Sequence, residues 1–207
     1  MDIKQVLTEI ITKNILVQKK ESAIYSEQAV KFKLAIELYR SSQIISILES
    51  KIPKKKQYLD IYFCENSRKY GIEVKYKTKL NEILENKFEY TNQSAQNFGK
   101  YYYLRDINRL ERYVLDNIID EGYAVLITND PNYMNYGRDN TLIQKYDIYN
   151  GKEINGKYPG IKQKGKEKND ITINGSYKTE WFPMEFKNPD RDTAYFNCCI
   201  VKIVNEK

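Results

Sequence analysis

The chain has 207 residues, of which 41% are hydrophobic, and a net charge of +6 at pH 7, so it is long enough for one domain with a buried core and is compatible with a nucleic-acid partner. It contains no histidine, which excludes Ser-His-Asp and Cys-His catalysis, histidine-metal nucleases and zinc proteases in their usual forms. No run approaches the ~20 apolar residues that cross a membrane, no signal-peptide stretch is apparent, and the three cysteines make no disulfide framework, so we expect a cytoplasmic protein.

The first part of the sequence predicts two helices and a strand. Apolar residues recur at helical spacing over residues 3–11. A second helix is expected to begin near Ser26, with Glu27 in its first turn. The short apolar run 44–48 indicates a strand, and the lysine triplet 54–56 that follows indicates a basic turn.

The next segment has the most ordered pattern in the chain. Residues 58–64 read as a strand, residues 65–69 as a polar turn and residues 70–76 as the returning strand. Together they predict an antiparallel hairpin.

A long helix and a buried strand are expected after this hairpin. A polar loop over 77–96 leads to a stretch over 104–118 in which apolar residues keep helical spacing. Residues 123–128 are almost entirely apolar, which is typical of a buried central strand that follows a crossover helix.

The remaining sequence predicts a loop and several short strands. Residues 151–170 are rich in Gly, Lys and Asn, and we expect a long, mobile basic loop or hairpin there. Short strands are expected over 171–173, around Trp181 and over 193–204. The order of elements favours one α/β domain with a mixed sheet over two domains.

Three ionisable residues of the predicted hairpin suggest chemistry. Glu73 and Lys75 lie two apart on a strand and therefore share a face. Asp60, which stands between Leu59 and Ile61 on the other strand, would come opposite Glu73. Two adjacent carboxylates repel unless a cation lies between them, and hard oxygen ligands suit Mg²⁺ or Mn²⁺. Lys75 would then hold a water for attack on phosphorus. The alternative is an exposed hairpin face with an ordinary Glu–Lys pair.

The pattern Asp60 followed by Glu73-x-Lys75 on a strand hairpin resembles the core motif of the PD-(D/E)xK nuclease superfamily, which includes many restriction endonucleases. Leu59 stands where that motif usually has a proline. The resemblance implies a restriction-endonuclease-like α/β (α+β) fold, a mixed sheet flanked by helices. It also implies a Mg²⁺-dependent nuclease that cuts DNA, with an early helix that supplies another Glu, for which Glu27 is the candidate.

The resemblance covers residues 22–130 well, including the run Glu-Val-Lys-Tyr-Lys-Thr-Lys over 73–79. It implies a single nuclease-like domain over residues 1–207, with peripheral strands in 131–207. In this interpretation Asp60 and Glu73 bind the metal and the Val74 carbonyl adds a ligand, since backbone oxygens serve hard cations.

The resemblance leaves the identity of the helix acid and the oligomeric state open. Glu37 is the alternative to Glu27 as the helix acid. If both DNA strands are cut symmetrically, a homodimer is the natural arrangement.

Five further residues are candidates for binding DNA. Lysines near the proposed site would grip flanking phosphates, although loop lysines are often only solvated. Residues at the start of the long helix would contact the scissile region, as Gln and Tyr do in some relatives, or would simply form a polar helix face. The candidates are Lys55, Lys77, Lys79, Gln96 and Tyr102.

Two other functions remain open at the level of sequence. One is a non-catalytic protein that keeps the nuclease-like fold and binds nucleic acid or a protein partner. The other is a Mg²⁺-dependent enzyme for small phosphoesters, which is disfavoured because no G-x-x-x-x-G-K-[ST] phosphate loop is present.

Overall fold

The computed structural model describes residues 1–15, 26–53, 55–79, 95–139, 141, 144–163, 165–184 and 196–205. The helices are α1 (Ile3–Glu9), η1 (Ile10–Asn14), α2 (Glu27–Ser42), α3 (Gln96–Leu115), η2 (Pro131–Tyr133) and η3 (Gln144–Tyr146). The strands are β1 (Ser46–Lys51), β2 (Tyr58–Glu65), β3 (Arg68–Lys77), β4 (Glu121–Thr128), β5 (Glu153–Tyr158), β6 (Lys162–Gln163), β7 (Lys166–Glu167), β8 (Ile171–Lys178), β9 (Trp181–Pro183) and β10 (Asn197–Val204).

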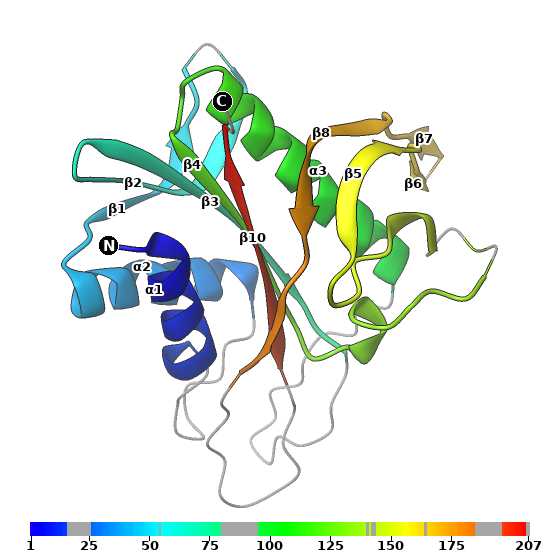
Figure 1. Cartoon of the computed structure of the whole chain (residues 1–207), viewed down its shortest axis with the longest axis horizontal. Helices are drawn as coiled ribbons and strands as arrows, with labels where there is room; N and C mark the ends of the chain where they lie inside the picture. The colour runs from blue at the N-terminus through cyan, green and yellow to red at the C-terminus, as the bar shows by residue number, and fades with distance from the viewer. Residues whose placement is uncertain are drawn as a thin grey trace, which may run out of the picture.

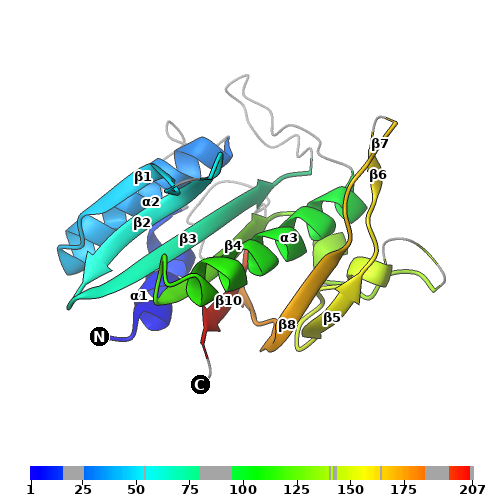
Figure 2. The ribbon, with the colours of Figure 1, turned by 90° about the horizontal axis from the view of Figure 1, so that it is seen from above.

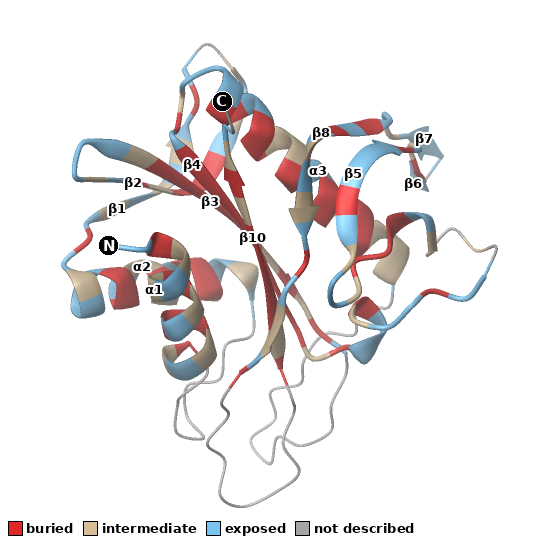
Figure 3. Ribbon diagram, in the orientation of Figure 1, coloured by how far each residue is buried: buried red, intermediate tan, exposed pale blue. Residues whose placement is uncertain are grey.

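Six of these strands form one mixed sheet in the order β1-β2-β3-β4-β10-β9 (Figure 1). All neighbouring pairs are antiparallel except β3 and β4, which run parallel. A parallel pair needs a crossover connection, and α3 supplies it. Every residue of β4 is buried (Figure 3). The expected α+β class, crossover helix and buried central strand are therefore confirmed.

The sheet has a hydrophobic core on each face. On one face it packs against α1, η1 and α2. On the other face it packs against α3, and the β5–β8 pair lies beside that helix (Figure 2). Cys198 and Cys199 belong to different cores, as expected for neighbours on a strand. The layers are thus helix, sheet and helix.

The start of α2 follows from its sequence. The Ser26 side chain accepts a hydrogen bond from Ala29 N at 3.1 Å, which satisfies one of the free amides of the first turn. The helix ends at Ser42 and is capped by Gln43, whose φ of 57° is left-handed. The predicted start of this helix and the position of Glu27 in its first turn are confirmed.

β2 changes orientation at Asp60. Leu59 packs in the α3-side core, whereas Ile61 packs in the α2-side core. In a regular strand two residues at this spacing would share a face. Across the ladder, Glu49 of β1 has a φ of 50°, which is unusual for a residue other than glycine. The strand therefore turns at this point, and the Asp60 side chain is directed toward the edge of β3.

Several sequence expectations need correction or fall elsewhere. The first strand is displaced toward the C-terminus, since the apolar run 44–48 only partly overlaps β1. Within residues 151–170, expected as a loop or hairpin, β6 and β7 form a short antiparallel hairpin, whereas β5 is a strand that pairs with β8. Lys54 and most of the expected loop 77–96 lie outside the described residues. Among the described helices, none combines the length and apolar character needed to cross a bilayer.

Candidate active site

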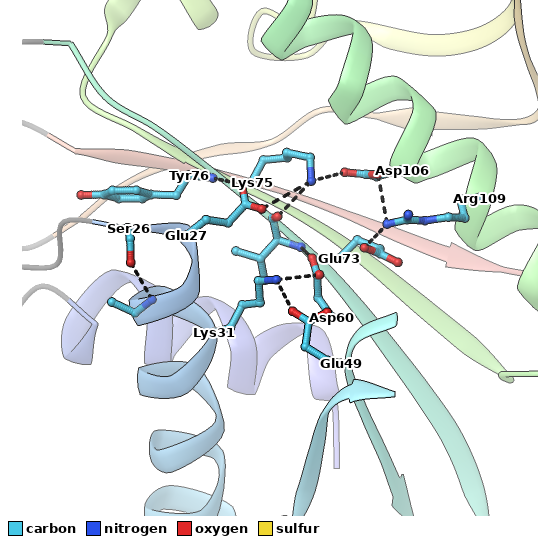
Figure 4. Close-up of polar contacts among 12 residues, drawn as sticks. Ser26, Glu27, Lys31, Glu49, Asp60, Glu73, Lys75, Tyr76, Asp106 and Arg109 are labelled. Carbon is cyan, nitrogen blue, oxygen red and sulfur yellow. Dashed lines mark hydrogen bonds and ion pairs between the residues drawn. The ribbon is translucent and has the colours of Figure 1, made fainter. Parts of the chain in front are cut away.

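The middle of β3 carries the predicted motif. Ile72, Val74 and Tyr76 pack in the α2-side core, so Glu73 and Lys75 leave β3 on the opposite face, as predicted. The backbone pairing of β2 with β3 runs from Glu65–Arg68 to Ile61–Ile72. Beyond that point two amides on the β3 edge bond to carboxylates: Val74 N donates to Asp60 Oδ2 at 2.8 Å and Tyr76 N to Glu27 Oε2 at 3.2 Å. Asp60 and Glu27, both predicted site residues, therefore reach the same edge of β3 (Figure 4).

Asp60 is paired with a lysine from α2. Its Oδ1 accepts a hydrogen bond from Lys31 Nζ at 2.9 Å, and the same ammonium contacts Glu49 Oε1 at 2.6 Å. Burial alone would raise the pKa of Asp60, but the Val74 amide and the Lys31 ammonium outweigh it and leave the pKa lowered. Asp60 is therefore a carboxylate at neutral pH, and both its oxygens have partners.

Glu73 has a different environment. Its side chain is fully buried, and its Oε2 forms an ion pair with Arg109 Nη2 of α3. Oε1 has no hydrogen-bond partner among the described residues. Burial raises the pKa of Glu73 well above its ordinary value, Asp106 adds to this, and Arg109 opposes it. A carboxylate oxygen is thus held inside the protein without a donor.

Lys75 links the strand to both helices. Its Nζ lies 2.9 Å from Asp106 Oδ2 of α3 and 3.8 Å from Glu27 Oε1 of α2. It also donates to the Val74 carbonyl at 3.3 Å. Burial by itself lowers the pKa of Lys75, but the carboxylates of Asp106 and Glu27 outweigh it and leave the pKa raised. Lys75 is therefore an ammonium and acts as a hydrogen-bond donor.

These contacts define one ionic cluster, which spans α2, β1, β2, β3 and α3 (Figure 4). Glu27 and Glu49 lie at its solvent-facing rim, with side chains 34% and 46% exposed, while Glu73 and Asp106 are buried. The cluster has five acidic and three basic side chains, and the half-buried Lys77 lies next to it. Its members are Glu27, Lys31, Glu49, Asp60, Glu73, Lys75, Asp106 and Arg109.

The donor set of the cluster is chemically suited to a hard divalent cation. Carboxylate and carbonyl oxygens are the ligands that Mg²⁺ and Mn²⁺ prefer, and Mg²⁺ usually keeps several waters besides one or two protein carboxylates. Asp60, Glu73 and the Val74 carbonyl supply such oxygens, the uncompensated Glu73 Oε1 among them. Within the described residues, no group of three or more acidic or cysteine side chains is arranged to hold a metal. The fit therefore rests on two carboxylates and one backbone oxygen.

The alternative helix acid lies away from the cluster. Glu37 pairs with Lys33 at 3.0 Å and with Arg40 at 3.1 Å, both on α2 itself. Glu27 instead contacts Lys75. Of the two candidates, Glu27 is the one that the fold brings to the motif.

The candidate DNA-binding residues are spread along α3 and the end of β3. Lys55 pairs with Asp116 at 2.6 Å and Gln96 donates to Asp130 at 2.7 Å, at opposite ends of α3. Since α3 rises ~1.5 Å per residue, each end is about 15 Å from Asp106.

The other three candidates lie closer to the cluster. Tyr102 is one turn before Asp106 on α3, with Arg105 4.5 Å above its ring. Lys77 is half-buried two residues beyond Lys75, and burial lowers its pKa. The Lys79 backbone exchanges hydrogen bonds with the Asn129 side chain, which ties the end of β3 to the end of β4.

Four members of the cluster were not predicted from the sequence: Lys31, Glu49, Asp106 and Arg109. Asp106 and Arg109 also pair with each other within α3, at 3.2 Å. Their contacts with Lys75 and Glu73 were not expected. A signal was present, because Lys31 and Asp106 fall on the apolar stripes of their helices and are nevertheless ionisable.

Comparison with known proteins does not identify a family. We found no match to a family model, to a curated protein or to a solved structure. The likeness to the PD-(D/E)xK superfamily stays a prediction, and function is inferred from the geometry of the ionic cluster.

Proposed function

We propose that this protein is a Mg²⁺- or Mn²⁺-dependent nuclease that hydrolyses DNA phosphodiester bonds in the cytoplasm, in restriction or another defence task. The observation that supports this most is the convergence of Asp60, Glu73, Lys75 and Glu27 from two strands and a helix into one ionic cluster. Side chains of an ordinary solvated hairpin face would point into water instead.

Each residue has a role in the proposed reaction. Asp60, Glu73 and the Val74 carbonyl would hold the cation, which when bound supplies Lewis-acid polarisation of the phosphate. The Lys75 ammonium donates hydrogen bonds to the attacking water or to a phosphate oxygen, and its raised pKa keeps it from serving as the base. Glu27 and Asp106 orient Lys75 through their contacts at 3.8 and 2.9 Å.

The DNA backbone would lie over Lys77, Lys79 and Tyr102, which are near the cluster. Lysines there neutralise phosphates, and an aromatic ring can support a base or sugar. Lys55 and Gln96 would contact DNA only beyond the immediate site, because they lie at the ends of α3. A two-fold dimer follows if both strands are cut.

A second function is favoured by one observation. Asp60 and Glu73 each pair with a cation of the protein, Lys31 and Arg109. Such pairs also suit a non-catalytic protein that keeps this fold and binds nucleic acid or another protein. Metal-dependent cutting separates the two functions, since only the nuclease should show it.

The deciding experiment is digestion of plasmid DNA and oligonucleotides with Mg²⁺ or Mn²⁺. Wild type should cut, whereas Lys75→Ala and Glu73→Ala should lose cutting while keeping native circular dichroism. Lys69→Ala is the matched control, because Lys69 lies on the same strand but contacts Asn117, outside the cluster. If the wild type does not cut, or the two site variants cut as well as it does, the proposed nuclease function is wrong.

A further inference from the structure

Both candidate metal ligands are paired with a cation in the same way. Lys31 Nζ lies 2.9 Å from Asp60 Oδ1, and an Arg109 Nη2 contact joins Glu73 Oε2. Together the two side chains carry the charge of one divalent cation. They therefore compensate the same carboxylates that a metal would use.

Each of these cations also has a second carboxylate partner. Lys31 lies 2.6 Å from Glu49, on the side away from the motif. Arg109 lies 3.2 Å from Asp106, one turn earlier on α3. If either cation leaves the motif acid, it still has a partner and is not left as an isolated buried charge, which would be costly.

Arg109 does not have the contacts of a fully satisfied structural arginine. A guanidinium offers five N–H donors in a fixed fork, and a structural Arg–carboxylate pair commonly uses two of them side by side. Here one terminal nitrogen, Nη2, makes both contacts, and the buried Nε has no hydrogen-bond partner among the described residues. Glu73 Oε1 also has no hydrogen-bond partner in that part of the chain. The Arg109–Glu73 contact is therefore a charge pairing with unused donors and acceptors on both sides.

We infer that Lys31 and Arg109 are exchangeable counter-ions. When a divalent cation binds Asp60 and Glu73, Lys31 releases Asp60 and stays paired with Glu49. Arg109 likewise releases Glu73 and stays paired with Asp106. This inference rests on the proposed metal site and assigns two further residues to it. Asp106 then has two tasks, since it orients Lys75 and receives Arg109. The cluster has five acidic against three basic side chains, which suits the binding of a divalent cation.

If Lys31 and Arg109 compete with the metal for Asp60 and Glu73, their removal should change the metal affinity, which can be measured without substrate. Mn²⁺ is titrated into the full chain by calorimetry at neutral pH. Arg109→Met removes the competitor for Glu73 and should tighten Mn²⁺ binding at least about tenfold, which corresponds to ~1.4 kcal/mol. Lys31→Met repeats the test at Asp60, so the inference stays testable if one variant does not fold. Arg112→Met, an exposed arginine one turn beyond Arg109, is the matched control and should leave the affinity unchanged.

The outcomes separate this inference from the proposed function. Tighter binding by Arg109→Met or Lys31→Met with an unchanged control supports exchange. If the wild type binds Mn²⁺ and both variants bind it equally or more weakly, Lys31 and Arg109 have a purely structural role. The inference then fails while the metal site stands. If neither the wild type nor the variants bind Mn²⁺, the metal site and the inference fail together.

Discussion

A second buried ion pair allows a sharp test of the energetics of this fold. Lys100 of α3 is completely buried, and its Nζ lies 2.9 Å from Oδ1 of the buried Asp147. The other carboxylate oxygen of Asp147 accepts a hydrogen bond from Gly137 N at 2.8 Å. The pair therefore fastens the segment around η3 to the first turns of α3. Lys100→Met removes the ammonium, and among the described residues the Gly137 amide is then the remaining donor to the carboxylate.

The expected cost of Lys100→Met is large because an unpaired charge remains inside. Removing one partner of a buried ion pair typically costs about 3–5 kcal/mol. For a chain of this length ~1 kcal/mol lowers Tm by about 2–4 °C, so a fall of roughly 10 °C is expected. In the double variant Lys100→Met with Asp147→Asn no charge is left, and the amide oxygen can still accept from Gly137. The double variant should therefore be less destabilised than the sum of the single variants by at least about 1 kcal/mol.

Denaturant unfolding and scanning calorimetry of the four proteins in the cycle measure these differences. Lys157→Met on β5 is the control, because this exposed lysine should matter by less than about 0.5 kcal/mol. The reasoning is refuted if Lys100→Met costs under about 1 kcal/mol, or if the two single effects simply add.

Two further predictions follow from single carboxylates. Glu111 of α3 accepts hydrogen bonds from Asn174 N, Gly175 N and Tyr177 Oη; Glu111→Ala should cost about 2 kcal/mol and should speed hydrogen exchange of those two β8 amides more than that of β4. Equal acceleration throughout would contradict this. Asp60 has a lowered pKa, so its contribution to stability is present above its ordinary value of 3.8 and is lost as pH falls through the lowered pKa. The destabilisation by Asp60→Asn, measured by urea unfolding, should therefore shrink between pH 7 and pH 2.5, and a constant difference would rule out this origin.

The parts of the fold that could be predicted are those set by local sequence. Ser26 caps α2 through its own side chain, and the hairpin of β2 and β3 follows from a two-residue period around a polar turn. β5 was not predicted as a strand, because its register shifts between Ile154 and Gly156 and this interrupts the apolar alternation. A bulge of this kind depends on the partner strand, which sequence does not reveal.

The site was predictable to a similar extent. The spacing of Glu73 and Lys75 fixed their common face, and that face is observed. Their partners come from helices, and which helical residue meets the strand depends on how the helix docks. Asp60 and Lys31 are 29 residues apart in sequence. Periodicity shows only that Lys31 and Asp106 are charged residues on apolar stripes, without showing which acid or base each will meet.

Glu73 is the residue that stability alone explains least. Asp60 and Glu27 have an evident structural task, because they bind the amides that β3 leaves unpaired beyond Ile72. Glu73 accepts no backbone hydrogen bond from any described residue, is fully buried, and has its pKa raised by that burial. Replacement of a whole buried ion pair, here Glu73 with Arg109, by apolar residues of similar size is often neutral or stabilising. A carboxylate kept at this position, with Arg109 as its counter-ion, is more readily understood as a ligand for a cation than as part of the core.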